Sequence, residues 1–390
     1  MDPVSNPFAP GAGAPPPELA GRDMVIQKAS VALQRLAQGN FARSMILTGL
    51  RGVGKTVLLN KIRQDAEARE FICIRLEAPE GRSLPSLVAP GLRTALLKLD
   101  RMKAATAGAK RALRALAGFV GAMRLSFHDV ELKMDVEPEP GLADGARLDD
   151  SLAQLLVAVG QAAREKGTVV VLFIDELHVV PPEELAALIM ALHIAAQDLL
   201  PITLMAAGLP QIPARMGEAK TYAERLFEFP RIDRLDQAAA HLAIVKPAKH
   251  LGVDFTTEAF DEIFDRTKGF AYFLQEWGKH AWDVADASPI DLEDVRACEP
   301  IAIAALDESF FNVRFGQLTQ PQKQYLRAMA ELGPGPHRSG DVAVTLGKKV
   351  TSVAVTRDQL IAKGMIYSPI HGETAFTVPM FDEFLKRVLP

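Results

Sequence analysis

The sequence is poor in cysteine and has no long apolar run. It contains two cysteines, Cys73 and Cys298, too few for a disulfide framework or a cysteine-based metal cluster. The longest apolar stretches, near residues 169–174 and 199–209, fall well short of the ~18 residues that a membrane span requires. No basic-then-apolar signal pattern opens the chain. We therefore expect a cytoplasmic protein without membrane contact.

An excess of positive charge is also missing. The net charge is -4, so any surface for nucleic acid must be local. The eight histidines are scattered without metal-ligand spacing. With 48% hydrophobic and 24% charged residues, the composition is that of a globular protein. The length of 390 residues favours two or three domains.

Regular structure is excluded from the first segment, residues 1–22. Its first twenty residues hold six prolines and two glycines, which prevent a helix or a strand interior. Two interpretations stay open from composition: a floppy tail, or an arm that packs on the next domain.

Residues 23–230 alternate between buried strands and helices. Apolar runs predict strands over 44–48, 71–76, 168–174 and 202–207, and helical spacing predicts helices that include 55–69 and 183–198. Buried strands that alternate with helices indicate a parallel sheet covered on both faces. The predicted fold class is therefore α/β.

The stretch at about 81–150 interrupts this alternation. Residues 93–124 carry eight Lys or Arg and one acid in helical sequence, whereas residues 129–150 carry eight acids and two bases. The favoured interpretation is a solvated insertion whose halves attract each other. A basic helix that contacts nucleic acid or a partner is the alternative.

A phosphate-binding loop lies between the first strand and the next helix. Residues 49–56 read GLRGVGKT, and glycines there let backbone N–H groups approach phosphates at a helix N-terminus. Lys55 is expected to reach the β- and γ-phosphates of ATP, and Thr56 to bind Mg²⁺. The predicted nucleotide-binding residues are Gly49, Arg51, Gly52, Val53, Gly54, Lys55, Thr56 and Val57.

An acidic pair follows the strongest strand signal. Asp175 and Glu176 end the apolar run from Val169, so their carboxylates are expected at the sheet edge beside the phosphate-binding loop. Asp175 is predicted to hold Mg²⁺, directly or through water. Glu176 is predicted to orient and deprotonate the attacking water, which favours hydrolysis over simple binding.

These motifs, with LLPITLMAAGLP, TYAERLFEFPRI and TKGFAYFLQEWGKHAW, resemble AAA+ and STAND-type P-loop ATPases. The likeness covers most of residues 18–390 and is closest to bacterial and archaeal AAA family ATP-binding proteins related to origin-recognition initiators. It implies a five-stranded parallel sheet, a helical lid at 231–316 and a homo-oligomer. It also places Gly21 and Arg22 near the adenine, which favours an ordered arm.

The resemblance further implies an arginine that reaches a neighbouring subunit's γ-phosphate. Arg225 is the candidate, with Arg231 and Arg234 as substitutes. Its alternative is an ordinary surface arginine. Two departures indicate a slow switch rather than a fast motor: residues 205–208 read MAAG where a polar sensor is usual, and Ala271 follows Gly269-Phe270 where a lid arginine or a proline is usual.

Other aromatic and titratable residues are assigned mainly to structure. His178 could touch the reacting water, but a structural role is favoured. Trp277 and Trp282 recur at helical spacing with nearby aromatics, so they are predicted to form lid core rather than a base-stacking platform.

Residues 317–390 carry the pattern of a winged helix. Helices are predicted at 322–332, 339–346 and 350–363, with strands at 365–368 and 374–378 around a wing at 369–373 and a closing helix. We expect this domain to have its own core. In a helix-turn-helix order the third helix faces DNA. The predicted DNA-binding residues are Lys348, Lys349, Thr351, Ser352 and Arg357, with Thr356 also available.

The sequence therefore predicts an ATP-binding, slowly hydrolysing switch that needs Mg²⁺. Its nucleotide state would control oligomerisation and the binding of double-stranded DNA through the winged helix. The alternative is a STAND-like signalling or defence ATPase whose winged helix binds a protein partner. A small-molecule kinase is disfavoured, because the chain after Pro230 offers a lid and a winged helix rather than an acceptor pocket.

Overall fold

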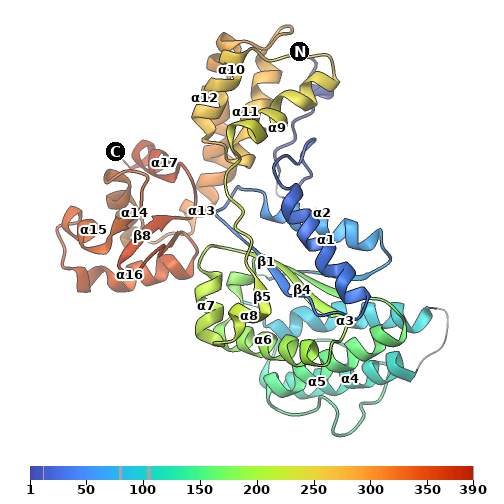
Figure 1. Ribbon diagram of the computed structural model, residues 1–390. Coiled ribbons are helices and arrows are strands. Elements are labelled where there is room, and N and C mark those ends of the chain that lie inside the picture. The colour runs from blue at the N-terminus through green and yellow to red at the C-terminus, as the bar shows by residue number, and fades with distance from the viewer. Residues whose placement is uncertain (12, 79–80, 103–106, 390) are drawn as a thin grey trace.

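The computed structural model describes residues 1–11, 13–78, 81–102 and 107–389. Its larger sheet is parallel, in the order β2-β3-β4-β1-β5 (Figure 1). The strands are β1 (Ser44–Thr48), β2 (Ile72–Glu77), β3 (Val170–Asp175), β4 (Ile202–Gly208) and β5 (Phe227–Glu228). The four predicted strands and the α/β class are confirmed, and β5 is added. This order sets the carboxyl ends of β1 and β3 on either side of β4, at one edge of the sheet.

Side chains that alternate along the strands pack into two hydrophobic cores. Val171 and Phe173 face one core with α1 (Asp23–Ala37) and α2 (Lys55–Glu67). Leu172 and Ile174 face the other core. Successive strand residues point to opposite faces, which explains the nearly continuous apolar runs in the sequence. The second core is covered by α3 (Leu84–Arg101), α4 (Ala107–Ser126), α5 (Leu148–Glu165) and α6 (Pro182–Gln197).

The segment at about 81–150 is not a peripheral insertion. Leu92, Leu96, Leu116 and Phe119 of α3 and α4 are fully buried in the second core, so the interpretation as a solvated insertion is wrong for their apolar faces. The expected attraction between its halves is present, since Arg93 forms an ion pair with Asp135 at 2.7 Å. Arg111 and Arg114 likewise face Glu139 at 3.6 and 4.0 Å. Lys103, another of its basic residues, lies outside the described residues.

A helical lid stands above the carboxyl edge of the sheet (Figure 1). Its helices are α9 (Gln237–His250), α10 (Thr257–Thr267), α11 (Ala271–Val284) and α12 (Leu292–Leu306). Two short helices, α7 (Ile212–Ala219) and α8 (Ala223–Leu226), precede it beside the sheet. Trp277 and Trp282 are 0% and 3% exposed, which confirms that they belong to the lid core.

The first residues form an ordered arm on the lid. A single helical turn, Pro3–Ser5, opens the arm, and the side chain of Asn6 donates to Asp283 Oδ1 at 2.8 Å. Phe8 is 3% exposed and meets Phe255 edge-on. The described residues of the arm form no helix or strand beyond this turn, yet buried aromatic contact is enough to fix the chain. Of the two interpretations of this segment, the packed arm is confirmed for its described residues.

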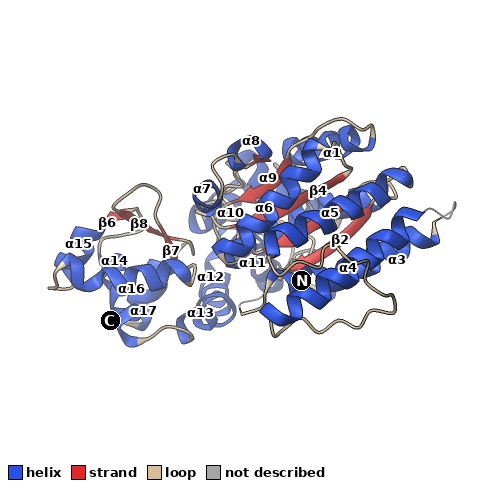
Figure 2. Cartoon of the chain, turned by 90° about the horizontal axis from the view of Figure 1, so that it is seen from below, coloured by secondary structure: helices blue, strands red, loops and turns tan. Residues whose placement is uncertain are grey.

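The C-terminal elements form the expected winged helix (Figure 2). They are α14 (Gln320–Glu331), β6 (His337–Arg338), α15 (Ser339–Thr345), α16 (Val350–Ala362), β7 (Ile366–Tyr367), β8 (Glu373–Phe376) and α17 (Phe381–Val388). The strands pair antiparallel in the order β6-β8-β7. The short strand β6 was not predicted, because two residues show no alternation.

The winged helix does not have a separate core. A π-helical turn (Asp307–Phe311) and α13 (Asn312–Gly316) join the lid to α14. Phe311 of this turn stacks on Phe384 of α17 at 5.2 Å, and Phe310 and Phe273 extend the aromatic contact into the lid. The prediction of an independent core is wrong, because a buried aromatic cluster crosses the junction.

Candidate nucleotide site

The phosphate-binding loop connects β1 to α2, as predicted. Gly52 and Gly54 have φ angles of +79° and +91°, a region that side chains with a Cβ rarely adopt. A Cβ at Gly49 would lie 2.1 Å from the carbonyl oxygen of Ile232. These glycines are therefore required by the backbone, and the loop presents its N–H groups at the N-terminus of α2.

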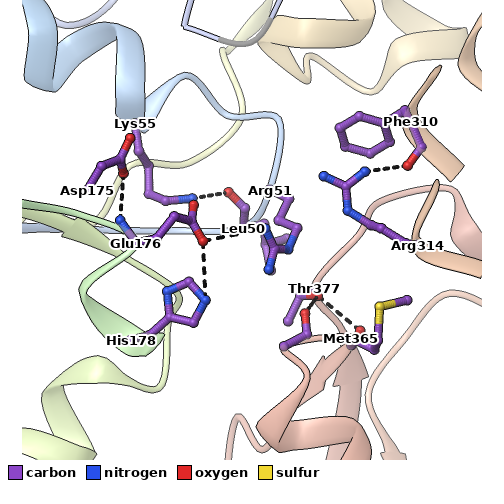
Figure 3. A network of polar contacts seen from close by, with 11 residues as sticks. Leu50, Arg51, Lys55, Asp175, Glu176, His178, Phe310, Arg314, Met365 and Thr377 are labelled. Carbon is purple, nitrogen blue, oxygen red and sulfur yellow. Dashed lines mark hydrogen bonds and ion pairs between the residues drawn. The ribbon is translucent and has the colours of Figure 1, made fainter. Parts of the chain in front are cut away.

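Lys55 is the buried cation of the loop, and 7% of the residue is exposed. Its Nζ donates to the carbonyl of Leu50 at 2.8 Å (Figure 3). Burial lowers the pKa of Lys55 to about 8, although Glu176 and Asp175 oppose part of this shift. A charged group that is removed from water needs a compensating partner, and the phosphates of a nucleotide would provide one.

The acidic pair lies at the carboxyl end of β3, across β4 from the loop. Glu176 adopts a left-handed backbone conformation with φ of +51°, and its N–H donates to Asp175 Oδ1 at 2.9 Å. Such a backbone is strained for a residue with a Cβ and is common at functional sites.

The carboxylate of Glu176 is held by two neighbours through one oxygen. Arg51 Nη1 lies 3.5 Å from Glu176 Oε2, and His178 Nε2 lies 3.3 Å from the same atom (Figure 3). Burial, helped by Arg51, lowers the pKa of His178 to about 3, so its ring is neutral at physiological pH. The neutral ring lies against the Glu176 carboxylate, which makes His178 a candidate positioning residue for this group.

One cavity of about 1210 Å³ contains this site. It exceeds the ~300–1,000 Å³ of usual ligand pockets, because separate segments contribute to its wall. They include the arm (Pro10, Gly13), the loop (Gly52–Val57), the acidic pair, α11 (Tyr272, Gln275), α13 (Arg314) and the winged helix (Lys363, Met365). Gly49 is the one predicted nucleotide-binding residue of the loop that does not line it.

Thr56 and Asp175 both line this cavity and fit a Mg²⁺ site. A hydroxyl and a carboxylate are hard oxygen donors, and Mg²⁺ commonly takes such ligands together with phosphate oxygens. Gly13 of the arm lies over Thr56, since a Cβ there would be 3.1 Å from Thr56 Cγ2. Among the described residues no cluster of three or more His, Cys, Asp or Glu could hold a metal by itself.

Arg22 connects the arm to both the loop and the base of the lid. Its guanidinium donates to Val53 O at 3.1 Å and to Asp233 O at 2.7 Å. Gly21 has a φ of +69°, and a Cβ there would lie 2.9 Å from Ala239. Arg22 lines the cavity and Gly21 does not. The contact of both residues with the adenine stays a prediction.

The winged helix also reaches the site, which no sequence pattern indicated. The N–H of Arg51 donates to Thr377 O at 3.0 Å. A Cβ at Gly364 would lie 3.1 Å from Arg51 Nη2 and 2.9 Å from Leu209 Cδ1. We call these interactions of Arg51 with Thr377 and Gly364 the interdomain contact (Figure 3 shows Arg51 opposite Thr377). Residues more than 300 positions away in the chain thus touch the phosphate-binding loop.

Arg215, which no motif indicated, contacts the turn that follows Glu176. Arg215 of α7 donates to the carbonyls of His178 and Val180, the latter at 3.0 Å. It fixes the turn after Glu176 through the backbone. Gly208, the last residue of β4, packs on Ile212, since a Cβ there would lie 2.8 Å from Ile212 Cγ1.

The candidate arginines for a neighbouring subunit lie apart from this cavity. Arg225 is exposed on α8 and does not line the site of its own chain, and no ion pair involves it in the described part of the protein. Arg231 forms an ion pair with Asp233 at 3.1 Å. Arg234 is exposed at the start of the lid. Arg225 and Arg234 are both exposed without an ion pair in the described residues, so the role of Arg225 stays a prediction.

The predicted DNA-binding residues gather around the N-terminal half of α16. Lys348, Lys349, Thr351 and Ser352 are exposed. Arg357 is different, since it pairs with Asp358 at 3.2 Å and donates to Ser368 at 3.4 Å. Thr356 is half-buried. The exposed surface therefore presents two lysines, and whether it binds DNA stays a prediction.

The comparisons with known proteins agree with this geometry. Residues 18–205 match the AAA ATPase domain family, and residues 308–385 match a family described as Domain of unknown function (DUF8462). The chain therefore carries an AAA ATPase domain, as its motifs predicted. No functionally curated protein matches it.

Solved structures are also similar to this chain. The Walker-type ATPase PABY2304 of Pyrococcus abyssi aligns with a TM-score of 0.54 at 14% identity, covering 94% of this chain and 96% of that one. Cdc6p of Pyrobaculum aerophilum gives 0.47 at 15%, covering 100% and 99%. The RuvB Holliday junction branch migration motor of Thermotoga maritima gives 0.44 at 17%, covering 95% of each. The first of these likenesses, at low identity, shows a common fold and nothing about activity.

We expect Lys55 to make nucleotide binding depend on pH. Its pKa of about 8 means that the ammonium is present below pH 8 and is lost above it. Because the ammonium is the form that binds phosphate, the affinity for ADP should fall above pH 8, approaching about tenfold per pH unit. Titration of a fluorescent ADP from pH 6.5 to 9.5 measures this. Lys61→Ala, a change at an exposed lysine of the same helix, should keep the profile; a flat wild-type profile would contradict the prediction.

No helix in the described part of the chain is both long and apolar enough to cross a bilayer.

Proposed function

We propose that this protein is an ATP-hydrolysing switch whose nucleotide state controls the affinity of its winged helix for double-stranded DNA. The observation that carries the proposal is the interdomain contact, because it joins the phosphate-binding loop to the domain that would hold DNA. Thr377 O accepts from the loop N–H at 3.0 Å, and Gly364 packs on the Arg51 side chain. A change at the phosphates therefore has a direct path to the winged helix.

The residues of the site support hydrolysis of the β–γ bond. The loop N–H groups and Lys55 would hold the β- and γ-phosphates, and Thr56 and Asp175 would hold Mg²⁺, which supplies charge neutralisation at the phosphates. Glu176 would accept a proton from the attacking water while the water oxygen bonds to the γ-phosphorus and ADP leaves. Water is thereby converted to a proton on Glu176 and a hydroxyl on the released phosphate.

The interaction of Glu176 with Arg51 supports a slow reaction. While Arg51 and His178 share Oε2, that oxygen is less able to accept a proton. Arg51 is in turn held by the winged helix. A single neutral hydrogen bond contributes about 1 kcal/mol, so nucleotide or DNA binding is sufficient to shift such a contact. Nucleotide binding would thus change DNA affinity, and DNA binding would change nucleotide affinity by the same factor, as thermodynamic linkage requires.

The interdomain contact can be tested at Gly364. Gly364→Ala places a Cβ against Leu209 and Arg51 and should loosen the contact, so that DNA affinity no longer differs between ADP and a non-hydrolysable ATP analogue. Gly372→Ala is the matched control, because Gly372 also has a positive φ, of +85° against +62°, but has open space around it. Fluorescence anisotropy with duplex DNA measures both. An unchanged nucleotide effect in Gly364→Ala would remove the contact from the switch.

The salt dependence of DNA affinity tests the predicted DNA-binding surface. If Lys348 and Lys349 bind phosphates, replacing both with alanine should lower the magnitude of the slope of log K against log salt by about 0.9 for each DNA phosphate that is no longer neutralised. Arg357→Ala should change it less, because Arg357 is already paired with Asp358. ADP affinity serves as the control and should stay normal. The absence of duplex binding by the wild type at low salt, with either nucleotide, would reject the DNA proposal.

The protein-partner alternative has one observation in its favour. Val350 and Val355 of α16 are 49% and 66% exposed beside the two lysines, and Val344 of α15 is 79% exposed. Apolar side chains on the helix that faces DNA suit a protein surface better than a phosphate backbone. Replacement of Val355 with serine should leave DNA affinity intact under the main proposal, and should abolish partner binding under the alternative.

A further inference from the structure

Arg314 is a cation of the nucleotide cavity that the motifs do not include. It belongs to α13, the short helix between the lid and the winged helix, and lines the same cavity as Lys55 and Arg51. Its guanidinium donates to the carbonyl of Phe310 and lies over the Phe310 ring, 4.3 Å from its centroid (Figure 3). No carboxylate forms an ion pair with it within the described residues.

Aromatic contacts bring Arg314 to the phosphate-binding loop. Phe310 stacks on Tyr272 of α11 at 5.1 Å, and the N–H of Tyr272 donates to Gly52 O at 2.9 Å. The edge of the Phe310 ring would lie 3.7 Å from a Cβ at Gly52. The π-helical turn that carries Phe310 is rare geometry, and π-bulges are frequent at functional sites. Contacts that run from Gly52 through Tyr272 and Phe310 thus hold Arg314 near the phosphate-binding loop.

Arg314 carries a positive charge inside this cavity. Burial lowers the pKa of Arg314 to about 10, with Arg51 adding to the shift and Glu176 opposing it. The guanidinium is still charged at neutral pH. Lys55, Arg51 and Arg314 line this cavity together with Asp175 and Glu176, and burial, helped by Arg51, lowers the pKa of the other two cations. Figure 3 shows the Arg314 guanidinium beside Arg51, and the Tyr272–Gly52 hydrogen bond links its aromatic neighbours to the phosphate-binding loop.

We infer that Arg314 binds the terminal phosphate of ATP and transmits its presence to the helix that joins the lid to the winged helix. ADP lacks this phosphate, so the linker would be held in the ATP state and released in the ADP state. A guanidinium suits this task, because its planar donors can bind two phosphate oxygens at once. The inference rests on the proposed function, in that it takes ATP to be the ligand.

The test compares two nucleotides in three variants of the full chain. Affinities for ADP and for the imido analogue of ATP, each with Mg²⁺, are measured by calorimetry in Arg314→Ala, Arg314→Lys and the control Arg296→Ala. Arg296 is an exposed arginine of α12 on the same lid. Arg314→Ala should lose roughly 10- to 100-fold in affinity for the ATP analogue, the value of a charged hydrogen bond, and change ADP affinity less than threefold. Arg314→Lys should show an intermediate loss of affinity for the ATP analogue. Arg296→Ala should bind both nucleotides like the wild type.

Each outcome has a definite meaning. Equal losses for both nucleotides in Arg314→Ala would overturn the inference, because a merely structural role in the linker weakens both alike. Unchanged affinities would overturn it as well. If Arg314→Ala does not fold, Arg314→Lys provides the test, through its loss of affinity for the ATP analogue relative to its loss of affinity for ADP. A wild type that binds ADP and the analogue but shows no nucleotide effect on DNA would instead reject the proposed switch and leave Arg314 as a phosphate-binding residue.

Discussion

Replacing Glu176 with glutamine should leave ATP binding within about twofold and reduce hydrolysis by roughly 10²–10⁴-fold, the range of general base catalysis. Glutamine keeps the shape of the side chain and can still interact with Arg51 and His178, which contact one oxygen of Glu176 at 3.5 and 3.3 Å. It cannot accept a proton from water. Nucleotide affinity and phosphate release, measured on the same preparation, separate the two effects.

Two comparisons make this result specific. Glu183→Gln changes an exposed glutamate in the next helix and should retain full activity. Lys55→Ala should abolish ATP binding, because it removes the buried cation that faces the β- and γ-phosphates. Wild-type turnover in Glu176→Gln would remove Glu176 from the catalytic role and make Asp175 the remaining carboxylate to examine.

Hydrolysis should depend on assembly and on Arg225. If Arg225 reaches the γ-phosphate of a neighbouring subunit, specific activity rises with protein concentration, and Arg225→Ala loses up to ~10³-fold in rate. Arg225 is exposed and does not line its own cavity, so its own site cannot use it without a rearrangement. Phosphate release across a range of protein concentrations measures this.

Mixing variants distinguishes action between subunits from a local effect. An Arg225→Ala subunit keeps an intact nucleotide site, and a Lys55→Ala subunit keeps Arg225. A mixture should therefore regain part of the activity at interfaces where the second completes the first. Arg111→Ala, an exposed arginine of α4, is the control and should behave like the wild type. Full activity of Arg225→Ala that is independent of concentration would contradict the prediction.

The local chemistry of the site could be predicted because it lies in short contiguous motifs. Residues 49–56 combine a strand end, required glycines and a helix start, and each of these has its own signal in the sequence. Asp175 and Glu176 follow an apolar run that is buried on both faces, so their position at the sheet edge follows from the parallel topology. The two lid tryptophans were also assigned correctly, since helical spacing of aromatics indicates a buried face.

The segment at about 81–150 shows where sequence patterns mislead. Its charge runs are real and form ion pairs such as Arg93–Asp135, but charge says nothing about the opposite face of the same helices. Leu96 and Phe119 are fully buried against the sheet. Amphipathic helices have both a charged and an apolar face, and counting charges describes one of them.

By itself, the sequence determined the P-loop α/β core, the winged helix and the residues expected to bind phosphate and Mg²⁺, because these depend on neighbours in the chain. Only the tertiary structure decided how the domains share the site. Thr377, Gly364 and Arg314 reach the phosphate-binding loop from segments that follow it by more than 250 residues, through one backbone hydrogen bond, one close packing contact and one aromatic cluster. Such contacts leave no local pattern, because they are fixed by how whole helices pack.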